Sequence, residues 1–375
     1  MQISSNFDGG NIFCLTCSDP ADIQLEIRKD RESEFFQWFY FRLSRAKGLA
    51  CDLKITNAGA AAYPRGWENY RAVASYDRVD WFRVPTDFDG DTLTIHHKPE
   101  RDNVFYAYFA PYSMERHLDL ISFCLKSPRT SMDVLGNTLD GQEIDLLTIG
   151  EARPDKLDLW AIARQHPGES MAEWWMEGFL ERLLDDNDPV ARALLEKAVF
   201  HIVPNMNPDG SRRGHLRTNA AGINLNREWQ EPSEEKSPEV FWVRRRMEET
   251  GVDFCLDVHG DEAIPHNFIA GPEGVPSFGD RQARLLSDFK NALLQASPDF
   301  QTEEGYPANQ PGRANLKIGA NWIAEQFGCL SMTLEMPFKD IGDGREQRQG
   351  WSPTRSRLLG RANLDAIYAV LRNLR

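Results

Sequence analysis

The sequence contains few cysteines and no long apolar run. Six cysteines are spread over 375 residues, and a chain of this length buries a core that needs no disulfide framework. No stretch approaches the roughly eighteen consecutive apolar residues of a membrane-spanning helix, and the first residues, MQISSNFDGGNIFC, lack the basic start and apolar run of an export signal. We therefore expect a soluble, cytoplasmic protein with reduced thiols.

An excess of positive charge is also absent. The chain has 57 acidic and 43 basic residues, which gives a net charge of -14. Such a surface repels the phosphates of nucleic acids and of anionic membranes. We expect neither of these as a partner, whereas a basic stretch on a substrate would not be repelled. The sequence gives no indication of the oligomeric state.

Alternating apolar residues predict β-structure over residues 1–115. In FQWFYFRL, the side chains of Phe39, Phe41 and Leu43 fall on one face of a strand. The same alternation occurs at residues 49–55, 93–97 and 104–110. No helix of useful length is predicted before Pro111. We interpret this part as an antiparallel β-sandwich rich in aromatic residues.

From about Ile121 onward the pattern is that of an α/β domain, which we assign to residues 116–375. Short apolar runs predict buried strands at IDLLTIG, LDLWAIARQ, AVFHIVP, VDFCLDVHG and CLSMTLEMP. Amphipathic stretches predict helices over residues 170–184, 189–197, 238–249 and 281–295, and a last helix that starts at Ser352 and Pro353. Residues 301–319, rich in glycine and proline, predict a long functional loop.

The segment HPGE places His166 and Glu169 where a buried strand ends and a helix begins. Ligands gather at such strand ends in α/β sheets, and an imidazole and a carboxylate three residues apart can converge on one cation. Zinc accepts this mixture of nitrogen and oxygen donors, and its catalytic sites use three protein ligands. Alone, the pattern also fits a surface histidine beside a helix-capping glutamate. A third ligand is therefore needed.

His259 supplies the third candidate ligand, because it follows directly on the apolar run VDFCLDV at another predicted strand end. His201 lies inside the run AVFHIVP and is interpreted as a core residue. The remaining histidines have no partner at ligand spacing and are interpreted as structural or exposed: His96, His97, His117, His215 and His266.

Glu335 lies inside the run CLSMTLEMP, where an unpaired carboxylate is costly to bury without a function. Beside a metal, such a carboxylate can take a proton from an activated water molecule and pass it to a leaving amine. Considered alone, Glu335 also fits a strand-end residue paired with an arginine.

Together these residues resemble the zinc carboxypeptidase family. The family pattern is H-x-x-E, an Asn-Arg pair, a distant His and a Glu on a late strand. This chain meets it in order at His166 to Glu169, NMNPDG (205–210), Asn226-Arg227, His259 and Glu335, over nearly all of residues 117–375. The aromatic β-region in front, the HPGE turn and the short gap before His259 resemble the cytosolic carboxypeptidase subfamily, which carries such a sandwich and trims glutamate from protein tails in eukaryotes.

The resemblance implies a fold and an activity. After the sandwich, it implies a mixed sheet flanked by helices. It also implies a metallocarboxypeptidase that hydrolyses C-terminal residues from peptides or protein tails. One Zn²⁺ per chain would be held by His166, Glu169 and His259, with Glu335 as the general acid and base.

Three further residues match positions of the family. Arg217 matches the arginine that polarises the scissile carbonyl and stabilises the oxyanion, a role that suits an always-charged guanidinium. Asn226 and Arg227 match the pair that holds the terminal carboxylate of the substrate, which an arginine fork can bind through two hydrogen bonds.

The chain departs from the family pattern at two places. Asn224 stands where the family usually has an aspartate that orients the first histidine ligand, so a hydrogen bond remains possible but no charge is added. The position of the substrate-capping tyrosine falls near Arg313, and Tyr306 in the loop GYPANQPGRANL is the best candidate for that role.

The loop that precedes Trp322 suggests a specificity. If Trp322 matches the family tryptophan that precedes the catalytic Glu, the resemblance puts Gly319 and Ala320 at the floor of the specificity pocket. Small residues there leave room for a side chain of the substrate. Arg313 and Lys317 on the same loop are bases in an acidic protein, so we hypothesise a preference for C-terminal Glu or Asp. The alternative is that both bases face solvent.

Two other functions fit the same residues. One is a zinc amidase of the same fold that removes an acyl group from a small amino acid, because such enzymes share the H-x-x-E and His ligands and also use the Asn-Arg pair. The other is a protein that binds peptides without turnover. The presence of Glu335 and Arg217 argues against the second.

Overall fold

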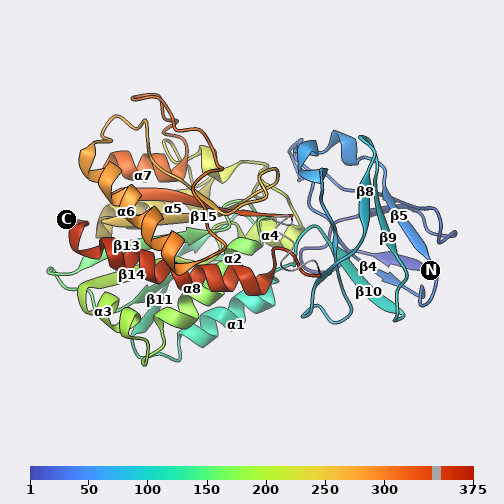
Figure 1. Cartoon of the computed structure of the whole chain (residues 1–375), viewed down its shortest axis with the longest axis horizontal. Coiled ribbons are helices and arrows are strands. Elements are labelled where there is room, and N and C mark those ends of the chain that lie inside the picture. The colour runs from blue at the N-terminus through green and yellow to red at the C-terminus, as the bar shows by residue number, and fades with distance from the viewer. Residues whose placement is uncertain (340–347) are drawn as a thin grey trace.

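The computed structural model describes residues 1–339 and 348–375 and consists of two parts side by side, with the N-terminus in one and the C-terminus in the other (Figure 1). The first part is built of strands, as the alternating sequence predicts. The second is a sheet covered by helices. Both predictions of fold are therefore confirmed.

The N-terminal sandwich has two five-stranded sheets. The first contains β1 (Gln2–Ser4), β4 (Tyr40–Ser44), β10 (Asn103–Ala107), β6 (Val73–Ser75) and β7 (Phe82–Arg83), in that order and antiparallel throughout. The second contains β2 (Phe13–Thr16), β3 (Ile23–Glu26), β5 (Cys51–Ile55), β9 (Leu93–His97) and β8 (Thr86–Phe88). Its β3 and β5 run parallel, which is the exception to the antiparallel arrangement. Short 3-10 helices η1 (Ala58–Ala60) and η2 (Pro64–Trp67) follow β5.

The strand predicted in FQWFYFRL is buried on both faces. Phe39, Phe41 and Leu43 are inaccessible to solvent, and Tyr40 on the opposite face is also buried. Phe7 packs edge-on against Tyr40 with 4.9 Å between the ring centroids. The aromatic residues of this strand therefore fill the core of the sandwich.

A mixed seven-stranded sheet forms the second part, in the order β11, β12, β14, β13, β15, β17, β16. The strands are β11 (Thr130–Asn137), β12 (Glu143–Ile149), β13 (Leu157–Ala163), β14 (Ala198–Val203), β15 (Phe254–Asp261), β16 (Phe268–Ala270) and β17 (Leu330–Pro337). The central strands β14, β13, β15 and β17 run parallel. All residues of β14, β15 and β17 are buried, which explains their continuous apolar runs.

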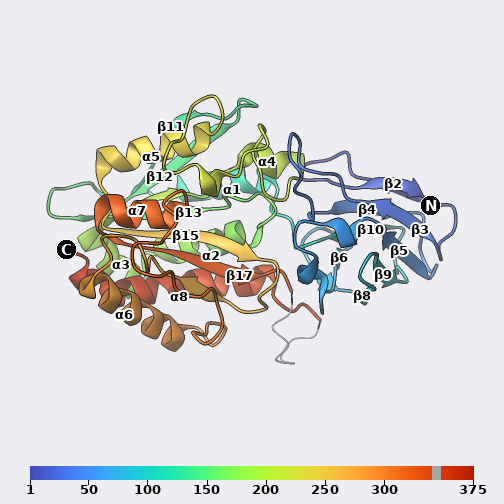
Figure 2. The same cartoon turned by 90° about the horizontal axis from the view of Figure 1, so that it is seen from above.

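Helices cover both faces of this sheet (Figure 2). Helices α2 (Met171–Leu183), α6 (Asp280–Ala296) and α8 (Pro353–Val370) lie on one face, and α5 (Pro238–Thr250) and α7 (Gly319–Phe327) on the other. The remaining helices are α1 (Met114–Cys124), α3 (Pro189–Lys197), α4 (Pro208–Arg213), η3 (Leu225–Arg227) and η4 (Leu371–Asn373). The five helices predicted from the sequence are all present, and Ser352 caps α8 by accepting a hydrogen bond from the amide of Arg355. In the described part of the chain, no helix combines the length and the apolar character needed to cross a membrane.

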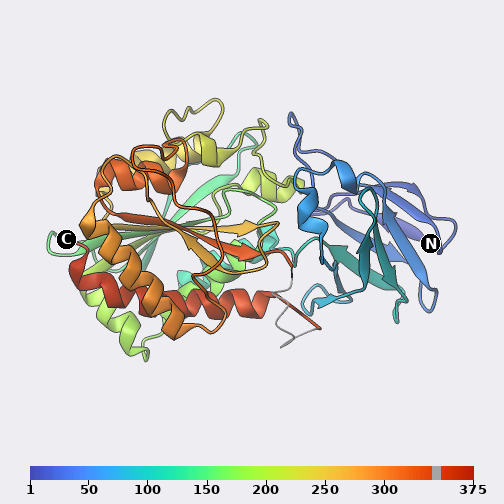
Figure 3. The same cartoon turned by 45° about the horizontal axis from the view of Figure 1, so that its top comes forward.

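The carboxyl ends of β15 and β17 point toward the sandwich (Figure 3). One continuous apolar core connects the two parts, and the rings of Tyr108 and Phe338 stack across the junction with centroids 4.4 Å apart. This packing brings loops of the sandwich close to the strand ends, where the candidate site lies.

Candidate active site

Three neighbouring strands bring the predicted residues together at their carboxyl ends. His166 follows β13, His259 lies in β15, and Glu335 pairs with His259 in register on β17. Arg164 turns the chain after β13 with a left-handed φ of 59°, and its guanidinium donates to the carbonyl oxygens of Pro167 and Tyr112 at 2.9 Å each. The turn that carries His166 is thus held by a buried side chain.

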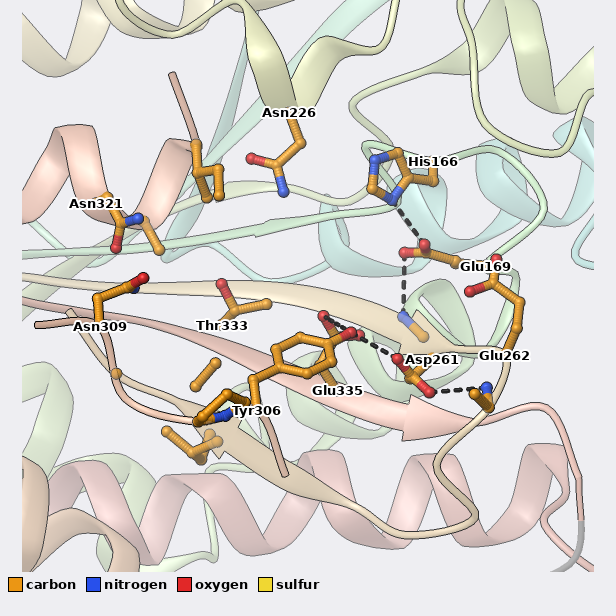
Figure 4. A pocket seen from close by; sticks show the side chains of 18 of the residues that line it. His166, Glu169, Asn226, Asp261, Glu262, Tyr306, Asn309, Asn321, Thr333 and Glu335 are labelled. Atoms are coloured by element: carbon orange, nitrogen blue, oxygen red, sulfur yellow. Dashed lines mark hydrogen bonds and ion pairs between the residues drawn. The ribbon is translucent and has the colours of Figure 1, made fainter. Parts of the chain in front are cut away.

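The three predicted ligands converge on one point. The Nδ1 atom of His166 lies 2.6 Å from Glu169 Oε1, and the Nδ1 atom of His259 lies 2.7 Å from Glu169 Oε2. The two Nδ1 atoms are 3.2 Å apart. All three side chains are buried, and they are the group in the described part of the chain that offers a cluster of metal ligands. Figure 4 shows two of them, His166 and Glu169.

The outer nitrogen of each imidazole has a partner that leaves Nδ1 free. His166 Nε2 lies 3.0 Å from the Oδ1 atom of Asn224, as predicted, and His259 Nε2 lies 3.0 Å from Asp257 Oδ1. Because Asn224 Oδ1 accepts a proton from His166 Nε2, the Nδ1 atom of His166 presents a lone pair to the Glu169 carboxylate, and the negative charge of Asp257 favours the proton of His259 on Nε2 in the same way. Facing lone pairs repel unless a cation lies between them, so this donor set fits a zinc ion.

The electrostatics of the two histidines differ. Burial and the charge of Arg217 lower the pKa of His166 to about 4, so this imidazole is neutral at neutral pH. Against the lowering effect of burial, Asp257 and Glu169 raise the pKa of His259 well above its usual value. Two carboxylates thus draw a positive charge, either a proton or a metal ion, to this side of the site.

Glu335 lines the cavity beside these ligands, and one of its carboxylate oxygens is unpaired among the described residues. Its side chain is 7% exposed, and Oε2 has no hydrogen-bond partner among residues 1–339 and 348–375. Burial raises its pKa well above the usual value, although His259 opposes the shift. A buried carboxylate with a raised pKa is suited to take up and hold a proton during a reaction.

Arg217 lines the cavity together with Asn226 and Arg227. Asn226 accepts a hydrogen bond from the amide of Gly319 at 2.8 Å, and Arg227 donates to the carbonyl oxygen of Asn226 at 2.6 Å. Burial and the charge of Arg217 lower the pKa of Arg227. Two guanidinium groups therefore face one cavity, which favours an anionic ligand there.

Tyr306 also lines the cavity, on the long loop that the sequence predicts. Its hydroxyl donates to Asp261 Oδ2 at 2.6 Å and lies 3.5 Å from Glu335 Oε1 (Figure 4). Its ring packs edge-on against Phe268 with centroids 4.9 Å apart. A side chain of the loop thus lies directly beside Glu335.

The cavity encloses about 430 Å³. Ala320 is buried and lines it, whereas Arg313 and Lys317 are exposed and do not. A different base lines the cavity: Lys290, on α6, together with Glu273.

Several residues of the site were not predicted from the sequence. They are Tyr63, Asp257, Asp261, Glu262 and Lys290. Asp261 and Glu262 follow His259 in HGDE, and their charge next to a ligand was a usable signal. Tyr63 comes from the sandwich, and no sequence pattern connects it to a site formed after residue 165. Burial raises the pKa of Glu262 to about 8.

In the described part of the chain, the remaining histidines lie outside the cluster of metal ligands. His117 is buried between Glu173, at 2.8 Å, and Asp145, at 3.2 Å. His201 is buried and stacks on Trp160 with ring centroids 4.9 Å apart. Both are structural residues of the second part.

Two family models match the chain. Residues 3–109 match the cytosolic carboxypeptidase N-terminal domain, and residues 124–359 match the zinc carboxypeptidase model. The second match alone covers more than half of the chain and includes the convergent ligands and Glu335.

Solved structures with similar sequences have the same fold over their whole length. The metallo-carboxypeptidase of Burkholderia cenocepacia is 52% identical with a TM-score of 0.97, and 99% of each chain is covered. A metallo-carboxypeptidase of Pseudomonas aeruginosa, in complex with (2-guanidinoethylmercapto)succinic acid, is 46% identical with a TM-score of 0.97, and all of both chains is covered.

Curated relatives include a protein of similar length and longer proteins of animals. An uncharacterized protein of Zymomonas mobilis is 55% identical over 374 residues, which cover 97% of its length. Cytosolic carboxypeptidase 3 of Bos taurus is 28% identical over 73% of this chain, and the match spans 31% of that longer protein. With the family model, the similar structures and the convergent ligands in agreement, the chain belongs to the zinc carboxypeptidase family and is a metallocarboxypeptidase of the type that uses one zinc ion.

Proposed function

We propose that the protein removes single residues from the C-terminus of peptides or protein tails. The observation that carries this proposal is the meeting of His166, Glu169 and His259 around one point, beside a cavity that Glu335 lines. When bound by the three ligands, zinc supplies a Lewis acid that activates water and polarises the scissile carbonyl.

Glu335 acts in this proposal as general base and then as general acid. Its unpaired Oε2 accepts a proton from the attacking water, and its raised pKa allows it to hold that proton until the amine leaves. Arg217 donates to the carbonyl oxygen as negative charge develops there, because its guanidinium lies in the cavity wall. The oxygen of the water bonds to the carbonyl carbon as the C–N bond breaks, and the proton held by Glu335 passes to the leaving amine, so atoms and protons balance.

Asn226 and Arg227 bind the terminal carboxylate of the substrate in this proposal. In the described residues, no carboxylate lies within ion-pair distance of Arg227, so its charge is available to a ligand. Burial lowers its pKa, which reflects a cation held without a partner. A terminal carboxylate would relieve this cost, and an internal peptide bond would not. Tyr306 would cover the bound residue from the loop side.

We propose a preference for acidic C-terminal residues. Ala320 leaves space at the cavity floor, and Lys290 lines the cavity, whereas Arg313 and Lys317 are exposed outside it. Lys290 is therefore the base that we assign to the side chain of the substrate. The ligand of the Pseudomonas relative combines a succinic acid with a basic guanidino group. In this chain the acidic residue Glu273 also lines the cavity, where it could meet a basic side chain. The test must therefore include basic substrates.

Matched variants test this preference. Lys290→Met should lower kcat/KM for a peptide ending in Glu about 10-fold or more, with little effect on one ending in Leu. Arg313→Met and Lys317→Met serve as controls, because both bases are exposed outside the cavity. If either control variant lost kcat/KM for the peptide ending in Glu, the base that binds the substrate side chain would be that loop residue and not Lys290. Equal turnover of peptides ending in Glu, Leu and Lys by the wild type would refute the preference.

Metal analysis combined with a peptide library tests the activity itself. One equivalent of zinc with loss of one C-terminal residue is expected. Glu335→Gln should keep the zinc and lose about 100- to 10,000-fold in kcat, the usual contribution of a general acid and base. Release of an acyl group from small acylated amino acids would favour the amidase of the same fold. Binding of peptides without turnover by the zinc-loaded protein would contradict the proposal.

We also propose that the chain divides near residue 115 into a sandwich domain, 1–115, and a catalytic domain, 116–375. The last strand of the sandwich ends at Ala107 and α1 begins at Met114. A cytoplasmic location is proposed because relatives with a similar sequence are named cytosolic. Fractionation of cells that produce the protein would test the location.

A further inference from the structure

A carboxylate of the sandwich reaches the backbone on both sides of Arg217. Asp30 Oδ1 accepts the amide of Leu216 at 2.7 Å. Asp30 Oδ2 accepts the amides of Arg217 and Thr218 at 2.8 and 2.9 Å, and the hydroxyl of Thr218 at 3.0 Å. Asp30 is 2% exposed. Four donors on one buried carboxylate fix the direction of this backbone strongly, because each is a charge-assisted hydrogen bond.

Two rings of the sandwich contact the Arg217 side chain. The Cζ atom of Arg217 lies 5.6 Å from the ring centroid of Phe35 and 5.3 Å from that of Tyr63. The two rings stack on each other with centroids 6.5 Å apart. Asp30 and Phe35 belong to one loop, since the Asp30 amide donates to the Phe35 carbonyl at 2.8 Å. Backbone and side chain of Arg217 are thus both held from the sandwich.

The Arg217 guanidinium forms no ion pair within the part of the chain that the structure describes. Among residues 1–339 and 348–375, no carboxylate lies within ion-pair distance of it. Its donors are therefore available to a substrate oxygen, and its position is set by the Asp30 contacts and by the two rings. A preorganised donor is worth more in catalysis than one that must be ordered during the reaction.

The segment 216–218, which Asp30 holds, is connected to the metal-binding turn. The Leu216 carbonyl accepts the amide of Gly168 at 2.9 Å. A Cβ on Gly168 would meet that carbonyl oxygen at 2.9 Å, so the contact is close. Asp30 therefore orients a segment that touches the turn between His166 and Glu169.

We propose that Asp30 is a positioning residue for Arg217, and that the sandwich, through Asp30, Phe35 and Tyr63, completes the catalytic centre. This inference rests on the oxyanion role of Arg217 in the proposed function. It assigns the N-terminal sandwich a part in the chemistry: without it, the loop 216–218 would lose the acceptor for three amides and the guanidinium would lose both rings. Asp30 itself touches no substrate atom.

The substitution Asp30→Asn tests the inference. An amide cannot accept on both sides, so at least one of the donors around Asp30 would face an NH₂ group. We expect kcat for the best C-terminal peptide to fall between about 10- and 100-fold, the size of effect that misplacement of a catalytic group by about 1 Å produces. KM should change less, and zinc content should stay at the wild-type level.

Asp8→Asn is the matched control. Asp8 is also a carboxylate of the sandwich, and it accepts the backbone amide of Met114, at the boundary between the two domains, at 2.7 Å. Met114 begins α1 and does not line the cavity. Asp8→Asn should therefore lower stability in a similar way and leave kcat within about twofold of the wild type, which is near the limit set for independent sites. An equal loss of kcat in both variants would indicate a general effect of weakened packing and would overturn the inference.

A double-mutant cycle separates positioning from stability. If Asp30 acts through Arg217, the double variant Asp30→Asn/Arg217→Ala should have the kcat of Arg217→Ala alone. If the two losses multiply, Asp30 acts by another route and the inference is wrong. If Arg217→Ala alone keeps full activity, the proposed role of Arg217 fails instead, so the two failures are distinguishable.

Phe35→Leu provides a second test, because it leaves the Asp30 carboxylate and its hydrogen bonds in place. Phe35 contacts Arg217 but does not line the cavity, so it cannot act on the substrate directly. We expect Phe35→Leu to lower kcat several-fold when it is introduced into the wild type. Introduced into Arg217→Ala, the same substitution should leave kcat unchanged. Wild-type kcat in Phe35→Leu and in Asp30→Asn would overturn the inference.

Discussion

At the scale of single residues, Asn224 is the hydrogen-bond partner of the first histidine ligand. Its Oδ1 atom accepts the proton of His166 Nε2 at 3.0 Å, in the place where the family usually has an aspartate. An amide oxygen orients the ring but adds no charge. The imidazole is therefore less basic at Nδ1 than it would be beside a carboxylate.

We predict that Asn224→Asp increases the affinity for zinc about 10-fold, since outer partners of metal-binding histidines contribute factors of 10 to 100. Competition with a chromogenic chelator at fixed pH would measure it. Asn224→Ala should shift the affinity the other way, because it removes the acceptor. Equal zinc affinity in all three proteins would show that Asn224 does not tune the ligand.

The residues of the site differ in how far the sequence could predict them. His166 and Glu169 are three residues apart, so local spacing was sufficient. His259 and Glu335 could be found because each follows or lies in an apolar run, and parallel strands end at one edge of a sheet. Tyr63 contacts Arg217 across more than 150 positions of sequence, and the packing of two domains determines that contact.

At the scale of elements, α3 and α7 show the difference between a helix that its local sequence predicts and one that it does not. The predicted α3 has exactly the expected bounds, with Asp188 as a cap and Pro189 in its first turn. α7 starts at Gly319 with no side-chain cap, and it is held by burial of Trp322 and Ile323 in the core. Tertiary packing, rather than local propensity, makes that segment helical.

Two glycines let α2 and α8 approach closely. A Cβ on Gly178 would lie 2.1 Å from the carbonyl oxygen of Arg357, and a Cβ on Gly360 would lie 2.1 Å from that of Trp175. Both neighbours are helix backbone and cannot move aside without moving the helix. The crossing of these helices therefore depends on glycine at two reciprocal positions.

We predict that Gly360→Ala lowers the free energy of unfolding by about 1–3 kcal/mol or more, the usual cost of overpacking. Gly279→Ala is the control, because a Cβ there meets only the Gln282 side chain at 4.0 Å. Denaturant unfolding followed by tryptophan fluorescence would measure both. Equal stability of the two variants would contradict the close approach of α2 and α8.

His117 connects three elements through its two ring nitrogens, since it lies in α1 and contacts Glu173 of α2 and Asp145 of β12. Burial opposes its charge, but the two carboxylates raise its pKa from 6.5 to about 9. The folded chain thus holds this proton more tightly than the unfolded chain does. The resulting stability is complete below pH 6.5 and is lost as the pH rises through 9.

We predict that between pH 6.5 and 9.5 the wild type loses about 3 kcal/mol more stability than His117→Gln does, the value that follows from the shifted pKa. Denaturant unfolding at several pH values would measure the difference. Parallel pH profiles for wild type and His117→Gln would contradict the prediction.

At the scale of the whole molecule, the two parts share one core and one site. The apolar cluster that fills the sandwich continues into the helices α2 and α8 of the second part, and Arg217 is held from the sandwich. The order of β and α/β segments could be predicted from sequence periods. Their docking could not, because it depends on contacts such as Asp30 with residues 216–218, which are separated by more than 180 positions.

Zinc should stabilise the entire chain, because its ligands come from β15 and from the turn after β13 and meet only when the sheet is formed. Binding to the folded state alone adds about 1.4 kcal/mol for each tenfold rise in free zinc above the dissociation constant. The melting temperature should therefore rise with buffered free zinc. Six cysteines and eight histidines of the unfolded chain also bind zinc, which makes the slope smaller at high zinc. His259→Ala should remove the dependence, and the same slope in that variant would place the stabilising zinc elsewhere than at the site formed by His166, Glu169 and His259.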